Sequence, residues 1–144
     1  MNNILNNVHT WFLDKINYEG ELELFLVEGK KGKPEQLKIL GADLGIASPV
    51  NTASDSSLVK ITFGNYVTWQ CVNESFSAFS EYEVGEKDRF FQVLSTSKYL
   101  DYVNETHGWY IHVIGSAKHF RVWTENEVIE VIAFEDPKIE LVEA

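Results

Sequence analysis

The sequence predicts an α+β fold: a mainly antiparallel sheet with an N-terminal amphipathic helix and one short helix. Apolar residues recur at helical spacing near the N-terminus, whereas period-two alternation dominates the second half of the chain. Strands do not alternate with long helices, as a parallel sheet would require. With 144 residues, 44% of them hydrophobic, the chain is expected to form one globular domain over residues 1–144.

The first element is expected to be a helix over residues 2–16. Asn2 or Asn3 can cap it by accepting a hydrogen bond from a free backbone N–H. A regular apolar stripe is typical of a helix that packs on a core, although a partner could also cover it. The stripe has six members: Ile4, Leu5, Val8, Trp11, Phe12 and Ile16.

The next segments are expected to form a hairpin and a loop. Leu22, Leu24 and Leu26 alternate with charged or aromatic residues, which predicts a strand over residues 21–28. A basic turn at residues 30–34 would lead into a second strand at 37–40. Residues 41–57 contain many turn-forming residues and are expected to be a loop.

The second half predicts a series of strands around one short helix. Strands are expected at 59–63 and 67–71, joined by a tight hairpin turn at Gly64 and Asn65, and at 89–94. The helix would span 97–105, with Ser95 or Ser97 as its cap. The last strands would be 110–114, 118–124 and 128–134, and Asp136–Pro137 would end the final one.

The charge of the chain is strongly acidic and unevenly distributed. Twelve Lys and Arg residues against 22 Asp and Glu give a net charge of −10, which disfavours binding to nucleic acid or to an anionic membrane. The excess of acids lies in the second half, where it could be a solvated surface or a docking face for a basic partner. The candidate partner-binding residues are Glu125, Glu127, Glu130, Glu135 and Asp136.

The single cysteine and the N-terminal residues suggest a cytoplasmic, soluble protein. Cys71 has no internal disulfide partner, which favours a reducing compartment. No signal peptide or apolar run of membrane-spanning length is visible. Alternation places Cys71 on the same strand face as Val67 and Trp69, so a buried, neutral thiol is expected.

The segment 118–134 carries the main candidate ligand-binding residues. Alternation places His119, Arg121 and Trp123 on one face of a hairpin, with Ala133 opposite His119 and Val131 opposite Arg121. An imidazole, a cation and an indole on one face suit a small anionic or planar ligand. The alternative is a half-exposed sheet face on which Arg121 pairs with an acid.

Further residues could join such a site. Glu74 ends a strand and could act as a base or as a partner of His119 or Arg121. Ser75 or Ser97 with His119 and an acid could form a nucleophilic group, although no Gly-x-Ser-x-Gly motif is present. No metal-binding or nucleotide-binding pattern is present, so neither a metal nor a cofactor is expected.

A series of short motifs resembles an uncharacterised family of small bacterial proteins. The motifs are Asn73-Glu74-Ser75, Ser97-Lys98-Tyr99-Leu100-Asp101-Tyr102, His119-Phe120-Arg121-Val122, Val128-Ile129-Glu130-Val131-Ile132-Ala133 and Pro137. The small, acidic, aromatic-rich chain is also similar in type to immunity proteins that neutralise toxins of interbacterial competition. The resemblance implies a cytoplasmic binding protein and directs attention to Glu74, Ser97, His119 and Arg121.

The sequence therefore favours a non-enzymatic binding protein, specifically an immunity-type inhibitor of a basic toxin domain. Negative charge would speed its encounter with a positive cleft of the kind that nucleases need to hold phosphates. The alternative is a small-molecule-binding protein or minor enzyme that uses a pocket of His, Arg and Glu side chains. A third possibility is a subunit that self-associates through its aromatic surface.

Overall fold

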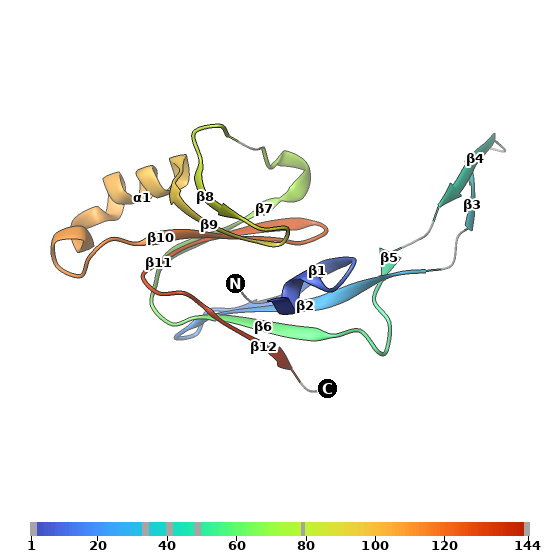
Figure 1. The fold of residues 1–144 in the computed structure, drawn as a ribbon, viewed down its shortest axis with the longest axis horizontal. Coiled ribbons are helices and arrows are strands. Elements are labelled where there is room, and N and C mark those ends of the chain that lie inside the picture. Colours follow the sequence, from blue (N-terminus) through green and yellow to red (C-terminus); the bar gives the residue numbers. More distant parts are fainter. Residues whose placement is uncertain (1–2, 33–34, 40–41, 48–49, 79, 143–144) are drawn as a thin grey trace.

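The structure, a computed structural model, is a pair of antiparallel β-sheets that lie one above the other (Figure 1). It describes residues 3–32, 35–39, 42–47, 50–78 and 80–142. Among these residues, no helix is long and apolar enough to cross a membrane.

The first sheet has the strand order β1-β2-β6-β12, with β5 paired to the end of β2. Strand β2 belongs here because its alternating leucines, Leu22, Leu24 and Leu26, are all fully buried on one face. Strands β3 and β4 form a separate hairpin that projects from the end of β2 (Figure 1). The strands are β1 (Thr10–Asn17), β2 (Leu22–Lys31), β3 (Glu35–Ile39), β4 (Ala42–Ala47), β5 (Val50–Asn51), β6 (Leu58–Phe63) and β12 (Lys138–Val142).

The second sheet has the strand order β7-β11-β10-β9-β8. Its central strands are rich in β-branched residues and are buried on both faces, because the first sheet covers one face and a helix covers the other. The strands are β7 (Tyr66–Asn73), β8 (Val84–Lys87), β9 (Phe91–Thr96), β10 (Lys118–Trp123) and β11 (Glu127–Ala133).

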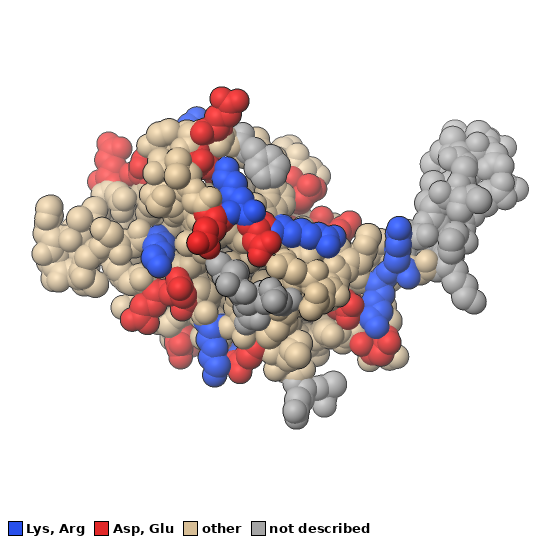
Figure 2. Space-filling model, viewed as in Figure 1, with Lys and Arg blue, Asp and Glu red and all other residues tan. Residues whose placement is uncertain are grey.

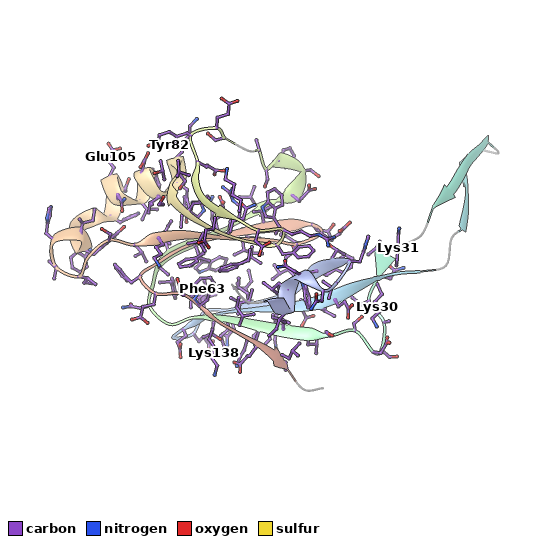
Figure 3. The ribbon with its side chains drawn as sticks, viewed as in Figure 1. Lys30, Lys31, Phe63, Tyr82, Glu105 and Lys138 are labelled. Atoms are coloured by element: carbon purple, nitrogen blue, oxygen red, sulfur yellow. The ribbon has the colours of Figure 1, made fainter. Side chains whose placement is uncertain are left out.

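The main core lies between the two sheets. Phe63 from the first sheet and Phe120 from the second are both fully buried, with ring centroids 5.4 Å apart. Figure 3 shows Phe63 in this layer between the sheets. Burial of apolar surface in this layer is the main contribution to the stability of the folded state.

Helix α1 (Lys98–His107) covers the outer face of the second sheet (Figure 1). Its start confirms the predicted cap, because Ser97 Oγ accepts a hydrogen bond from the Leu100 backbone N–H at 3.0 Å. Leu100 and Val103 pack on Ile132 of β11. Three short 3-10 helices complete the fold: η1 (Asn3–Asn6), η2 (Glu74–Phe76) and η3 (Gly108–His112).

The predicted α+β class is wrong, because 51% of the residues are in strands and the N-terminal amphipathic helix does not exist. Residues 3–6 form η1, and the rest of the expected helix is mainly strand β1, which pairs with β2. A bulge after Leu13 places Leu13 and Ile16, three positions apart, on the buried face opposite Leu26 and Leu24, whereas Phe12 of the expected stripe pairs with Val27. Pairing between Thr10–Asn17 and β2 therefore outweighs the local pattern.

Four local predictions also need correction. The strands around Gly64 and Asn65 exist but belong to different sheets, so this turn connects the sheets and does not close a hairpin. Strand β2 pairs with β1 and β6 and not with β3, and the expected loop 41–57 contains β4 and β5. The expected strand at 110–114 is largely η3, while Leu40 and Gly41 lie outside the described residues.

Candidate functional site

The first candidate site is a polar cluster on the outer face of the second sheet. The β10–β11 hairpin pairs Arg121 with Glu130 and His119 with Ile132. This register differs by one residue from the predicted one, which placed Val131 opposite Arg121. Glu130 was predicted as part of a partner-binding surface, but only 9% of it is exposed and it lies inside this cluster.

The cluster is a continuous hydrogen-bond network. His119 Nδ1 lies 2.6 Å from Ser97 Oγ, and its Nε2 lies 3.0 Å from Glu130 Oε1. Arg121 donates through Nε to the same Glu130 oxygen, and its Nη1 donates to Glu83 at 3.0 Å. Two amides extend the network: Gln92 Oε1 accepts from Arg121, and Gln70 Nε2 donates to Glu130.

The charges in the cluster stabilise one another. Burial alone would raise the pKa of Glu130, but hydrogen bonds and charge from His119 and Arg121 lower it to about 2. The hydrogen bond from Arg121 likewise lowers the pKa of Glu83 despite partial burial. Because an ionised carboxylate can only accept, His119 Nε2 carries the proton that points at Glu130.

The order Ser97, His119, Glu130 is that of a nucleophile, a base and an orienting acid, but its position argues against catalysis. Ser97 is 1% exposed and His119 is fully buried beneath α1 and the ring of Tyr99. Ser97 Oγ is also occupied as the helix cap. In this geometry the network joins α1 and the residue before β8 to the sheet, and no substrate reaches the hydroxyl.

Glu74 does not join this cluster. It is exposed at the start of η2, where its backbone N–H donates to the Asn126 carbonyl at 2.8 Å. With Trp123 and Glu125 it lines a separate cavity of about 370 Å³. The end of β10 borders this cavity together with Thr10 of β1 and Gln92 of β9.

The predicted acidic residues do not form one continuous surface. Glu125 and Glu127 flank the β10–β11 turn, where they accept hydrogen bonds from Thr10 and Thr124. Glu135 and Asp136 follow the opposite end of β11, a strand about 20 Å long. They belong to two separate acidic regions.

Cys71 is exposed at the edge strand β7, so its predicted burial is wrong. It lies opposite Ile129 of β11 and shares its face with Trp69, as predicted, whereas Val67 packs against the α1 cluster on the other face. Partial burial of the thiol and the charge of Glu127 raise the pKa of Cys71. The thiol therefore stays protonated at neutral pH and is a weak nucleophile.

An exposed apolar surface lies at the end of the molecule formed by η3, and the sequence reasoning missed it. We define the apolar tip as Trp109, Ile111, Val113 and Ile114, of which Trp109 is 70% and Val113 73% exposed. Figure 2 shows that this end carries no charged residues on the face in view. The signal in the sequence was the segment 106–117, which contains no Lys, Arg, Asp or Glu.

Tyr110 explains why its neighbours point outward. Its ring is buried against Phe134, with centroids 5.2 Å apart, and its hydroxyl donates to Asn104 at 2.6 Å. The Tyr110 carbonyl accepts hydrogen bonds from the backbone N–H groups of Val113, Ile114 and Gly115. This tight turn leaves the side chains on either side of Tyr110 in solvent.

A cavity of about 450 Å³ opens beside the apolar tip. Its size and its mixture of aromatic and polar groups fit an apolar side chain or a small planar ligand. It is lined by Asn65, Tyr66, Val67, Thr68, His107, Trp109, Tyr110, Ile114 and Phe134.

Among the described residues, no three His, Cys, Asp or Glu side chains are placed to hold a metal ion. Comparison with known proteins gives no match to a protein-family model, to a curated protein or to a solved structure.

Proposed function

We propose that the protein is a non-enzymatic binding protein, an immunity-type inhibitor that contacts a basic toxin domain through the apolar tip. The observation that carries this proposal is the exposure of Trp109, Val113 and Ile114 at one end of the molecule. A contiguous group of large apolar side chains in water is typical of a protein-binding surface. Tryptophan is the residue type most enriched among side chains that dominate binding energy.

The acidic residues near the apolar tip support a basic partner. Glu105 lies two residues before His107, and Glu135 directly follows Phe134, so both are close in sequence to residues that line the cavity beside the tip. Figure 3 shows Glu105 on the solvent side of α1. An apolar centre with a charged rim is the usual anatomy of a protein interface. The net charge of −10 adds long-range attraction to a positive cleft.

The buried state of the polar cluster supports a binding role over a catalytic one. His119 and Arg121 are the side chains best suited to chemistry, yet both are buried and hydrogen-bonded within the protein. Binding by an exposed surface requires no accessible acid, base or nucleophile.

The proposal is tested by measuring association with purified basic toxin domains of the nuclease type by biolayer interferometry. Trp109→Ala should weaken binding by about 30-fold or more, the effect typical of a central interface residue. Leu141→Ala is the matched control, because Leu141 is 59% exposed on β12 of the other sheet. Equal affinity of the wild type and Trp109→Ala would contradict the proposal, as would failure of every basic domain to bind.

The salt dependence of the association rate tests the role of charge. Exposed rim charges act mainly on the association rate, so binding should be fast at low ionic strength and slower at high ionic strength. Replacing Glu125, Glu127 and Glu135 with Gln and Asp136 with Asn should flatten this dependence. If the association rate changes neither with ionic strength nor with these replacements, the acidic residues contribute only to solubility.

A second candidate function is binding of a small planar molecule in the cavity beside the apolar tip. The aromatic lining, with Tyr66, Trp109 and Phe134, favours this candidate. It replaces the expected pocket of His119, Arg121 and Glu74, because His119 and Arg121 are buried and Glu74 lies apart from them. A thermal-shift screen against nucleotides, sugars and aromatic metabolites tests it, and a ligand whose stabilising effect is lost in Trp109→Ala would favour it over the inhibitor.

A further inference from the structure

The edge strands of the two main sheets differ in how they are protected from pairing with another chain. Strand β1 carries Asp14, Lys15 and a bulge, β12 carries Lys138 and Glu140, and β8 is only four residues long. Charges, bulges and shortness are the usual devices that prevent an edge from accepting another strand.

Strand β7 is longer than β8 and lacks charges, and its one irregularity lies at its first residues, where Tyr66 and Thr68 pair with consecutive residues of β11. Its eight residues, Tyr66–Asn73, include no charged residue and no proline. Among the described residues, β7 pairs only with β11, so its other edge has no strand beside it. Gln70, Cys71 and Asn73 are exposed, which leaves the centre and end of the strand accessible.

The two ends of β7 offer different chemistry. At the Tyr66 end, Tyr66, Val67 and Thr68 line the cavity beside the apolar tip. At the other end, three carboxylates gather: Glu74 follows β7 directly, Glu127 pairs with Asn73, and Glu125 lines the same cavity as Glu74.

None of these three carboxylates forms an ion pair with another described residue. Arg89 lines the same cavity as Glu74 and Glu125 but pairs with neither of them. The β7 edge therefore runs from a cavity with an aromatic and polar lining to a group of carboxylates without ion-pair partners.

We propose that β7 receives an extended segment of the basic partner as an added strand, with an apolar side chain in the cavity and Lys or Arg at Glu74, Glu125 and Glu127. This inference rests on the proposed function and names the element by which the partner binds. Strand addition supplies affinity through main-chain hydrogen bonds, while side-chain sites supply specificity. The separation of the two sites, about 25 Å along β7, sets the spacing of apolar and basic residues in the segment.

A second copy of this chain would suit the edge less well. Two β7 strands paired antiparallel would place the three carboxylates of one copy beside the cavity of the other. The carboxylates would then lose water without gaining a cation, which is unfavourable. Two molecules of net charge −10 also repel each other.

The test uses the full chain and synthetic peptides of about ten residues, long enough to span β7. One peptide has three lysines at its N-terminus, alternating Thr and Val, and a C-terminal Leu-Trp. A second peptide has the reversed order, since the segment can run in either direction. Controls replace the lysines with glutamates, or the alternating residues with prolines that cannot pair with a strand.

One lysine peptide should bind, slow hydrogen exchange of the β7 amides, and lose about tenfold in affinity in the triple variant Glu74→Gln, Glu125→Gln, Glu127→Gln. The matched control is Asp55→Asn, Glu81→Gln, Glu86→Gln, which removes the same charge from exposed positions outside β7 and its two ends. Binding should persist in this control and vanish for the proline peptide.

Three results would overturn the inference. The glutamate or proline peptide could bind as tightly as the lysine peptides, or neither lysine peptide could slow hydrogen exchange of the β7 amides at millimolar concentration. The β7 amides could also be protected in the protein alone because it self-associates. A basic toxin domain that binds through Trp109 without protecting β7 would also overturn it, while leaving the proposed function intact. Conversely, peptide binding on β7 with no basic domain bound would refute the proposed function alone.

Discussion

Arg121 and Glu130 face each other directly across the β10–β11 hairpin and form a buried ion pair. Glu83, the residue before β8, contacts the same guanidinium from the other side. Two carboxylates thus depend on one cation for compensation inside the protein. Buried ions of this kind contribute little when paired but are costly when one partner is removed.

Arg121→Ala should therefore strongly destabilise the fold. It leaves Glu83 and Glu130 buried without their cation, and the expected loss is roughly 3–5 kcal/mol in the free energy of unfolding. Urea unfolding followed by circular dichroism measures it. Lys118→Ala on the same strand is the control, because the exposed pair of Lys118 with Asp136 should contribute less than about 1 kcal/mol. A similar, small effect of both substitutions would mean that the cluster is hydrated in solution.

The stability should also fall in acid because of Glu130. Its pKa is lowered to about 2 in the folded state from an ordinary value of 4.5, so the folded protein binds this proton more weakly than the unfolded chain. The resulting stabilisation, about 3 kcal/mol, is fully present above pH 5 and is lost as the pH falls from 5 towards 2.

Urea unfolding at intervals between pH 6 and pH 2.5 measures this loss. In Glu130→Gln the slope between pH 5 and pH 2.5 should be much shallower, at the cost of lower stability at neutral pH. Glu140→Gln, which alters a partly exposed carboxylate on β12, should keep the wild-type slope. An unchanged slope in Glu130→Gln would assign the acid sensitivity to other carboxylates.

The polar cluster shows how far the sequence could predict the candidate site. Alternation correctly placed His119 and Arg121 on one face, and cap chemistry gave Ser97 as one of two candidate caps, beside Ser95. The register of the β10–β11 hairpin depends on the detailed geometry of its turn, and an error of one residue exchanged Val131 for Glu130. Glu130 was therefore not predicted to contact His119 and Arg121, and it was instead expected to lie on the acidic surface.

The N-terminal segment shows why the fold class was wrong. Strand β1 pairs with β2 from Thr10 to Asn17, and its bulge brings Leu13 and Ile16 to the buried face, in place of the Phe12 and Ile16 of the expected helical stripe. The pairing between β7 and β11 similarly joins residues about 60 positions apart, which no local pattern encodes. Periodicity found most strands correctly, but the assignment of strands to two sheets depends on such long-range contacts.

The two tryptophans Trp11 and Trp109 should respond oppositely to truncation. Trp11 is fully buried in the core, and its Nε1 donates to the Leu5 carbonyl at 2.9 Å. Trp11→Ala should therefore cost roughly 3–5 kcal/mol and lower the melting temperature markedly. Trp109→Ala, at a 70% exposed position, should leave the melting temperature nearly unchanged. A large loss in Trp109→Ala would show that the apolar tip packs within the protein and is not a free surface.

Ser97→Ala should destabilise the protein through two lost contacts. The helix α1 loses its cap on the Leu100 N–H, and His119 Nδ1 loses the hydroxyl at 2.6 Å. A lost cap and an unsatisfied buried nitrogen together cost about 2–4 kcal/mol. Ser95→Ala, two residues earlier at an exposed position, is the control and should cost well under about 1 kcal/mol.

The reactivity of Ser97 distinguishes a purely structural hydrogen-bond network from a hydrolase active site beneath α1. A fluorophosphonate reagent needs an accessible, activated hydroxyl, whereas Ser97 is 1% exposed beneath α1 and already accepts the Leu100 N–H. The folded protein should therefore remain unlabelled after prolonged incubation, as judged by intact mass. Labelling at Ser97 that disappears in His119→Ala but persists in Arg121→Lys would instead identify a working nucleophile and base. That result would require α1 to move away from the sheet, and hydrogen exchange of the α1 amides during labelling would reveal such opening.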